Sequence, residues 1–205
     1  MKKYLLSLGL IVALVAIMIP TISCKQSDLQ QVESYVNILL PAVEAAADVV
    51  ISVGDPKDIA LAQQIQTQVN TGVSQIETLA ASITSANATT VRAQIVAVAN
   101  AIKANISGLL TTAGVSPAEN AKVTELVTAA DALIDGIVAI FPPSTPAATF
   151  SAEQKAQVKV AVTNYKLRYN KIISTKTGDP KVDAALAKHH KFFVLGWKGI
   201  YPTFH

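Results

Sequence analysis

The chain has 205 residues, with 17 Lys and Arg against 14 Asp and Glu, and it contains a single cysteine. A chain of this length can bury one substantial hydrophobic core. The nearly balanced charge argues against a dedicated nucleic-acid binder. One cysteine excludes an internal disulfide framework and a cysteine-rich zinc site.

The first 23 residues have the features of a secretory signal peptide. Lys2 and Lys3 precede an apolar run of about 15 residues, the order of charge and hydrophobicity found in such signals. The run is short for a permanent transmembrane helix, which needs roughly 20 apolar residues. Pro20 then stops a helix, because proline lacks a backbone N–H and clashes with the preceding turn. We therefore predict a signal peptide over residues 1–23.

The residues that follow this run are Thr21, Ile22, Ser23 and Cys24. Ile22, Ser23 and Cys24 match the last three positions of a lipobox, so this region resembles a bacterial lipoprotein precursor. Thr21 departs from the usual aliphatic first position. The resemblance implies lipidation of the Cys24 sulfur and cleavage before it, and two or more acyl chains anchor a protein stably. Lys25 in place of Asp implies an outer-membrane address in a Gram-negative cell. Two alternatives are an ordinary secretion signal with a chance cysteine and an uncleaved membrane anchor.

Charge divides the remaining chain into two parts. Residues 24–150 contain five basic and eleven acidic side chains, whereas residues 151–205 contain ten basic and three acidic ones. Most aromatic residues also lie in the second part. The chain therefore has an acidic, alanine-rich front and a basic, aromatic-rich back.

The front predicts four amphipathic helices, because apolar residues recur there at steps of three and four. The first starts at a capping box at Ser27, is expected to kink or split at Pro41, and ends at Gly54. The other three are expected over residues 56–83, 91–110 and 117–141. Gly72 stands inside the second helix at a cost of about 1 kcal/mol relative to alanine, which a close helix contact would explain.

The joints between these helices are short, so neighbouring helices are expected to be antiparallel. The predicted fold class is all-α. Residues 24–145 form an up-and-down bundle of four long amphipathic helices. Residues 146–205 form a basic, C-terminal helical extension, with an aromatic-rich end, that packs on or beside the bundle.

The extension predicts a helix from Ser151 to about Ile173 and a shorter one from Asp179 to about His190. The first carries five bases: Lys155, Lys159, Lys166, Arg168 and Lys171. They are candidate contacts with an anionic envelope surface or a protein partner, together with Trp197 and Tyr201 of the aromatic end. The alternative is that the basic helix and the aromatic end pack on the acidic bundle of the same chain.

No catalytic, haem or phosphate-binding motif stands out in the sequence. Neighbouring helical residues point about 100° apart, so His189 and His190 are poorly placed to bind one metal ion. The pairs Asp131/Asp135 and Glu44/Asp48 are one helical turn apart, a spacing that is common on solvated helix faces. We expect neither an enzyme nor a cofactor. A metal or haem site at His189, His190 or His205 is the least favoured hypothesis.

Together these features predict a lipid-anchored, non-catalytic scaffold or interaction protein of the cell envelope. The membrane would be its partner through Cys24, and it would face the periplasm or the exterior. The alternative function is a binding module that holds a small molecule or lipid in the core of the helical bundle.

Overall fold

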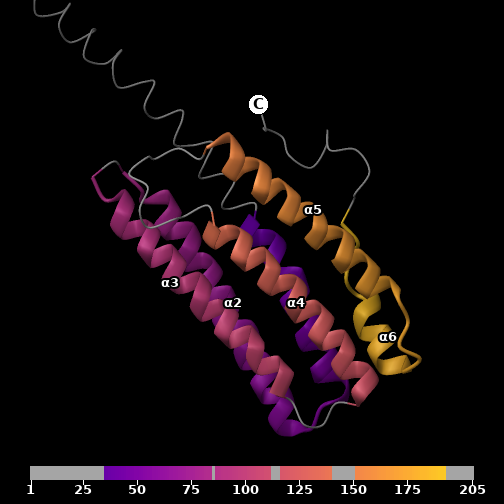
Figure 1. The fold of residues 1–205 in the computed structure, drawn as a ribbon. Helices are drawn as coiled ribbons and strands as arrows, with labels where there is room; N and C mark the ends of the chain where they lie inside the picture. Colours follow the sequence, from indigo (N-terminus) through magenta and orange to yellow (C-terminus); the bar gives the residue numbers. More distant parts are fainter. Residues whose placement is uncertain (1–34, 85, 112–115, 140–150, 193–205) are drawn as a thin grey trace, which may run out of the picture.

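A computed structural model describes residues 35–84, 86–111, 116–139 and 151–192. Cys24, Trp197 and Tyr201 lie outside these residues, as do the start of the predicted first helix and most of the aromatic end. Every regular element in the described part of the chain is helical, which confirms the all-α class. The long helices lie side by side, with α5 and α6 at one edge (Figure 1).

The first described helix spans Tyr35–Val53. It runs through Pro41 without a break, so of the two outcomes predicted for Pro41, a kink or a split, the split is wrong. Proline leaves the carbonyl of Asn37 without its usual donor, but Asn37 is exposed to solvent while Ala42 and Val43 beside the proline are buried. The packing of this helix therefore outweighs the loss of one hydrogen bond.

Five further helices follow as predicted, with shifts of a few residues at their ends. Their bounds are α2 (Pro56–Ala81), α3 (Ala88–Ser107), α4 (Pro117–Ala139), α5 (Ala152–Ser174) and the short α6 (Pro180–Ala187), and a 3-10 turn (Gly108–Thr111) extends α3.

Side chains cap the starts of three helices. The Asp55 side chain accepts hydrogen bonds from the N–H groups of Lys57 and Asp58, and Pro56 takes the first helical position of α2. Ser151 and Gln154 form a complete capping box at α5. Asp179 caps α6 in the same way as Asp55 caps α2. These caps fix where each helix enters the structure.

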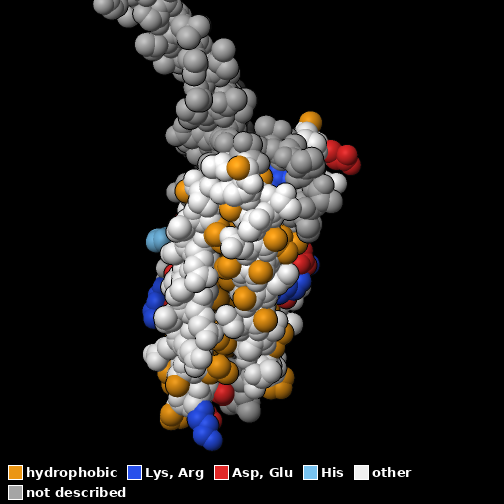
Figure 2. All heavy atoms as spheres, turned by 90° about the vertical axis from the view of Figure 1, so that its left-hand side faces the viewer, with side chains coloured by type: hydrophobic (Ala, Val, Ile, Leu, Met, Phe, Trp, Pro, Cys, Tyr) orange, Lys and Arg blue, Asp and Glu red, His pale blue; other side chains and the backbone are white. Residues whose placement is uncertain are grey.

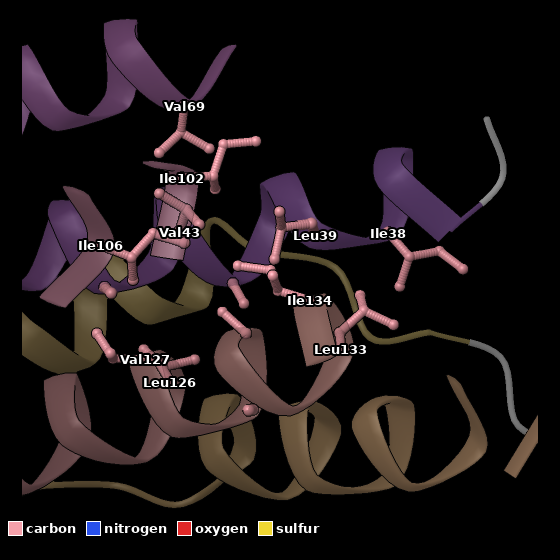
Figure 3. Close-up of a cluster of buried hydrophobic side chains, with 14 of the residues drawn as sticks. Ile38, Leu39, Val43, Val69, Ile102, Ile106, Leu126, Val127, Leu133 and Ile134 are labelled. Carbon is pink, nitrogen blue, oxygen red and sulfur yellow. The ribbon is translucent and has the colours of Figure 1, made fainter. Parts of the chain in front are cut away.

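The core is one continuous cluster to which all of these helices contribute. Figure 3 shows its centre, where Leu39 and Val43 of the first helix meet Ile102 of α3 and Ile134 of α4. The first helix is covered on several sides rather than along one stripe. Its buried residues include Tyr35, Val36, Ile38, Leu39, Ala42, Val43, Ala45, Ala46, Ala47, Val49 and Val50. A single apolar stripe, as the sequence predicted, accounts for only part of that set.

Glycines mark the closest approaches between helices. A Cβ atom added to Gly72 of α2 would lie 2.7 Å from Cγ1 of Ile102 on α3. Gly136 of α4 is likewise close to Ala161 of α5, at 3.1 Å between the added and existing Cβ atoms. The close contact that would explain Gly72 inside a helix is therefore present.

Candidate functional site: the basic helix α5 and its aromatic contacts

Helix α5 turns one face to the core and joins the first helix through a tyrosine. The buried residues of this face are Val158, Val162, Tyr165, Tyr169 and Ile172. The Tyr165 hydroxyl donates to the carbonyl of Ile38 at 2.6 Å. Burial raises the pKa of Tyr165 well above its ordinary value, so the hydroxyl keeps its proton and acts as a donor. This bond fixes the middle of α5 against the start of the first helix.

Three aromatic rings gather beside this contact. Tyr165 and Tyr169 lie one helical turn apart with ring centres at 6.0 Å. Phe192, which follows α6, packs against both, at 6.0 Å from Tyr165 and 5.1 Å from Tyr169. The tilted arrangement is one that aromatic pairs favour. The aromatic cluster of Tyr165, Tyr169 and Phe192 therefore ties the residues after α6 to α5.

Asn170 holds Phe192 in this position through its side chain. Its Nδ2 donates to the Phe192 carbonyl at 2.6 Å, and its Oδ1 accepts from the Phe192 N–H at 2.6 Å. Both polar groups of the Phe192 backbone are satisfied by one amide. The predicted packing of the aromatic end on the helices is thus seen for Phe192, its first residue.

The hydroxyl of Tyr169 is unusual. The side chain is fully buried, and the hydroxyl has no hydrogen-bond partner within the described residues. Burial, with a smaller contribution from the Glu44 carboxylate, raises the pKa of Tyr169 to about 12. An unpaired buried hydroxyl costs stability. Tyr165 and Tyr169 are therefore neighbours with the same side chain and opposite hydrogen-bonding states.

The five predicted basic residues of α5 do not share one surface. Lys166 is 5% exposed, with its Nζ 5.5 Å from the centre of the Phe192 ring, and burial lowers its pKa. Lys155 is half-buried on the same flank, and Lys159 is exposed there. At 100° per residue, Arg168 lies on the opposite flank and Lys171 points outward. Of the five, Lys159, Arg168 and Lys171 are exposed.

One histidine and two of the acidic residues singled out in the sequence have ordinary polar partners, and His205 lies outside the described residues. His189 Nε2 lies 3.1 Å from Oδ2 of Asp48, which ties the end of α6 to the first helix. Asp135 forms an ion pair with Lys103 at 2.8 Å. Burial raises the pKa of Asp131. Within the described residues, no group of three metal-binding side chains comes together.

A groove that sequence reasoning did not predict lies between α2 and α3, with a volume of about 780 Å³. Its lining is uncharged: Asn70, Thr71, Ser74, Gln75, Thr78, Leu79, Gln94 and Val98. Figure 2 shows this side of the molecule, where apolar and uncharged polar side chains fill the centre and charged ones lie toward the margins. The lining is uncharged on the α2 side because α2 has no charged residue from Ile59 to Ile76.

Two described helices, Tyr35–Val53 and Ala88–Thr111, are long and apolar enough to cross a membrane by length and composition alone. Half of the first helix's apolar window is buried in the core, as expected for a core helix.

Comparison with known proteins gives no relative: no family model, no curated protein and no solved structure matches the chain.

Proposed function

We propose that the chain is a lipid-anchored, non-catalytic scaffold or interaction protein of a bacterial cell envelope. The observation that carries the proposal is the placement of Cys24, the single cysteine of the chain, a few residues after a signal-like apolar run and directly after Ile22 and Ser23. An acyl anchor at that position would hold the helical part of the chain at a membrane surface.

The arrangement of the helices supports a scaffold. We propose that the first helix, α2, α3 and α4 form an up-and-down bundle on which the basic extension packs. Short joints connect these helices, and α5 shares their core. Aliphatic packing and paired polar groups account for most of the described interior, a composition suited to a rigid support.

The test is metabolic labelling with an alkyne fatty acid in a bacterial host, comparing the wild-type chain with Cys24→Ser. We expect the label in the membrane fraction for the wild type and its loss in the variant, with the intact mass showing cleavage before residue 24. A second variant, Lys25→Gln, leaves the cysteine in place and should keep the label. An unlabelled wild-type chain, or one cleaved elsewhere, would refute the anchor.

The second candidate function is a binding module for a small molecule or lipid. The specific observation in its favour is the groove between α2 and α3, whose volume lies in the range of ligand sites. It is a surface groove rather than a cavity in the core, so this proposal places the ligand between the helices at their outer side. Native mass spectrometry of protein purified from membranes tests it: a co-purified mass that is lost in Val98→Glu supports it, and bare protein contradicts it.

A further inference from the structure

The outward face of α5 carries an apolar and basic stripe that the core does not use. Val160, Asn164, Leu167 and Lys171 follow one another at steps of four, three and four residues, the spacing of one helix face. All four are exposed, and they lie opposite the buried tyrosines. We call these four residues the outer stripe.

Large exposed hydrophobic side chains are rare in the described part of the chain. Val160 is 59% exposed and Leu167 is 50% exposed, and the third such residue is Leu110, at 39%, in the turn after α3. Two of the three therefore stand one above the other on a single face of α5. Single exposed apolar residues need no explanation, but two of them one heptad apart on a basic helix form a small apolar patch beside positive charge, and a lipid surface could cover such a patch.

The charge around the stripe is positive. Lys171 lies within it, and Arg168 is exposed at its side. Helix α5 has five basic residues, and Glu153 in its first turn is its single acid. A face of this charge is complementary to anionic headgroups, and each Lys or Arg near such a surface adds to the attraction. Leu167 and Val160 would enter the boundary between headgroups and acyl chains.

The position of α5 places this face within reach of the proposed anchor. Ten residues lie between Cys24 and Tyr35, so the two are at most about 40 Å apart along a fully extended chain. The Tyr165–Ile38 hydrogen bond holds the middle of α5 against the start of the first helix. A tether of that length raises the effective concentration of a weak contact site at the same membrane. A small patch is therefore sufficient to keep α5 in contact with that membrane.

We propose that the outer stripe of α5 lies on the anionic phospholipid surface of the membrane to which Cys24 is anchored. This rests on the proposed lipid anchor, and it assigns the membrane contact to Val160, Leu167, Arg168 and Lys171. The buried Lys166 has no part in it.

The experiment uses the full-length chain reconstituted into phosphatidylcholine vesicles, with or without phosphatidylglycerol. Lysines are acetylated with an N-hydroxysuccinimide ester, and the rate at each site is read by mass spectrometry. We expect Lys171 to react about fivefold more slowly when phosphatidylglycerol is present, and high salt to restore its rate. Lys57 and Lys181, exposed on α2 and α6, serve as controls and should not change.

A matched pair of variants tests the apolar component. Leu167→Gln should remove most of the protection of Lys171, whereas the same change at Leu110 should leave it intact. Both residues are exposed, so neither change is expected to unfold the protein. Protection that persists in Leu167→Gln would overturn the assignment to lipid.

Two further outcomes separate this inference from the proposed function. If the chain floats with neutral vesicles but Lys171 reacts equally in both, the anchor stands and the stripe contact is wrong. If the chain does not float with neutral vesicles, the anchor is wrong, and the stripe is judged by protection in anionic vesicles alone. Equal protection of Lys171 by soluble polyglutamate would mean an acidic polymer is the partner and would overturn the lipid assignment.

Discussion

Helices α2 and α3 dock on each other in a different way from α5 and its neighbours. Between α2 and α3 the contact depends on shape: Gly72 lets Ile102 approach, and the outer side of the pair is an uncharged groove. Helix α5 also approaches α4 closely at Gly136, but it adds aromatic rings, a tyrosine–carbonyl bond and an amide that holds Phe192. Shape alone tolerates sliding and repacking, whereas directional bonds specify one position. We infer that α5 and residues 188–192, which follow α6, are the more strictly positioned part.

The largest effect is expected from filling the α2–α3 contact. Gly72→Leu inserts a side chain where even a Cβ would lie 2.7 Å from Ile102. Overpacking of this kind costs about 1–3 kcal/mol, and we expect a loss of about 3 kcal/mol in the free energy of unfolding, measured by urea denaturation.

The adjacent residue provides the control. Thr71→Leu adds the same side chain on the exposed side of α2 and should change stability by less than about 0.5 kcal/mol. The double variant Gly72→Leu with Ile102→Ala should recover part of the stability lost in Gly72→Leu alone, because the new Leu side chain can fill the space that Ile102 occupied. Equal effects at positions 71 and 72 would show that the contact is not tight.

The second prediction tests whether directional bonds hold the segment after α6. Asn170→Ala removes both hydrogen bonds to the Phe192 backbone, and we expect a loss of about 1–2 kcal/mol. Hydrogen exchange at the Phe192 amide should become faster. Asn164→Ala, one and a half turns away on the exposed side of α5, is the matched control and should leave both quantities unchanged.

The third prediction compares the two buried tyrosines of α5. Tyr165→Phe breaks the bond to the Ile38 carbonyl and should cost about 1 kcal/mol. Tyr169→Phe removes a hydroxyl without a hydrogen-bond partner in the described residues, so it should leave stability unchanged or raise it by up to about 1 kcal/mol. Urea midpoints of the two variants at constant m-value measure the difference. A loss of similar size in both would mean that the Tyr169 hydroxyl has a partner.

A fourth prediction concerns the stability of the wild type and of Tyr169→Phe at alkaline pH. The pKa of Tyr169 is about 12 in the folded chain against an ordinary value of 10.0, so the unfolded chain releases this proton first. Stability should therefore fall as the pH rises from 10 toward 12, because the unfolded state binds fewer protons in that window. Tyr169→Phe should make this fall shallower, and a pH series of urea midpoints measures the slopes. Identical slopes in wild type and variant would contradict the assignment.

Much of the fold could be predicted from sequence because its signals are local. Spacing at three and four residues and the caps at Asp55, Ser151 and Asp179 give the helices directly. The contacts of α5 are different, because Ile38 and Tyr165 are far apart in the chain and Asn170 meets Phe192 across α6. The single stripe predicted for the first helix was incomplete for the same reason: alanines at positions 42, 45 and 46 reveal burial only once several helices surround them.

For the candidate site, residue type alone was misleading. Lys166 has the charge expected of a surface contact, yet it lies under Phe192. The angle of each residue around the helix axis predicts the exposed face better than residue type does. The spacing of Val160, Asn164, Leu167 and Lys171 is visible in the sequence and places these residues opposite the tyrosines. Spacing alone does not say which face of α5 is exposed, because either face can turn inward and the sequence does not show which helices pack against it.

The smallest effect is expected at the ion pair that joins α3 to α4. Lys103 and Asp135 are 2.8 Å apart, with side-chain exposures of 35% and 62%. Solvent screens such a pair, so Lys103→Met should cost no more than about 0.5 kcal/mol at low salt and almost nothing at high salt. The hydrogen bond to Asp135 raises the pKa of Lys103, so its small contribution is present at neutral pH and fades only as the lysine deprotonates. A salt-independent loss above about 1 kcal/mol would mean that α3 and α4 depend on this bond for their register, so that α3 would dock by a directional bond as well as by shape.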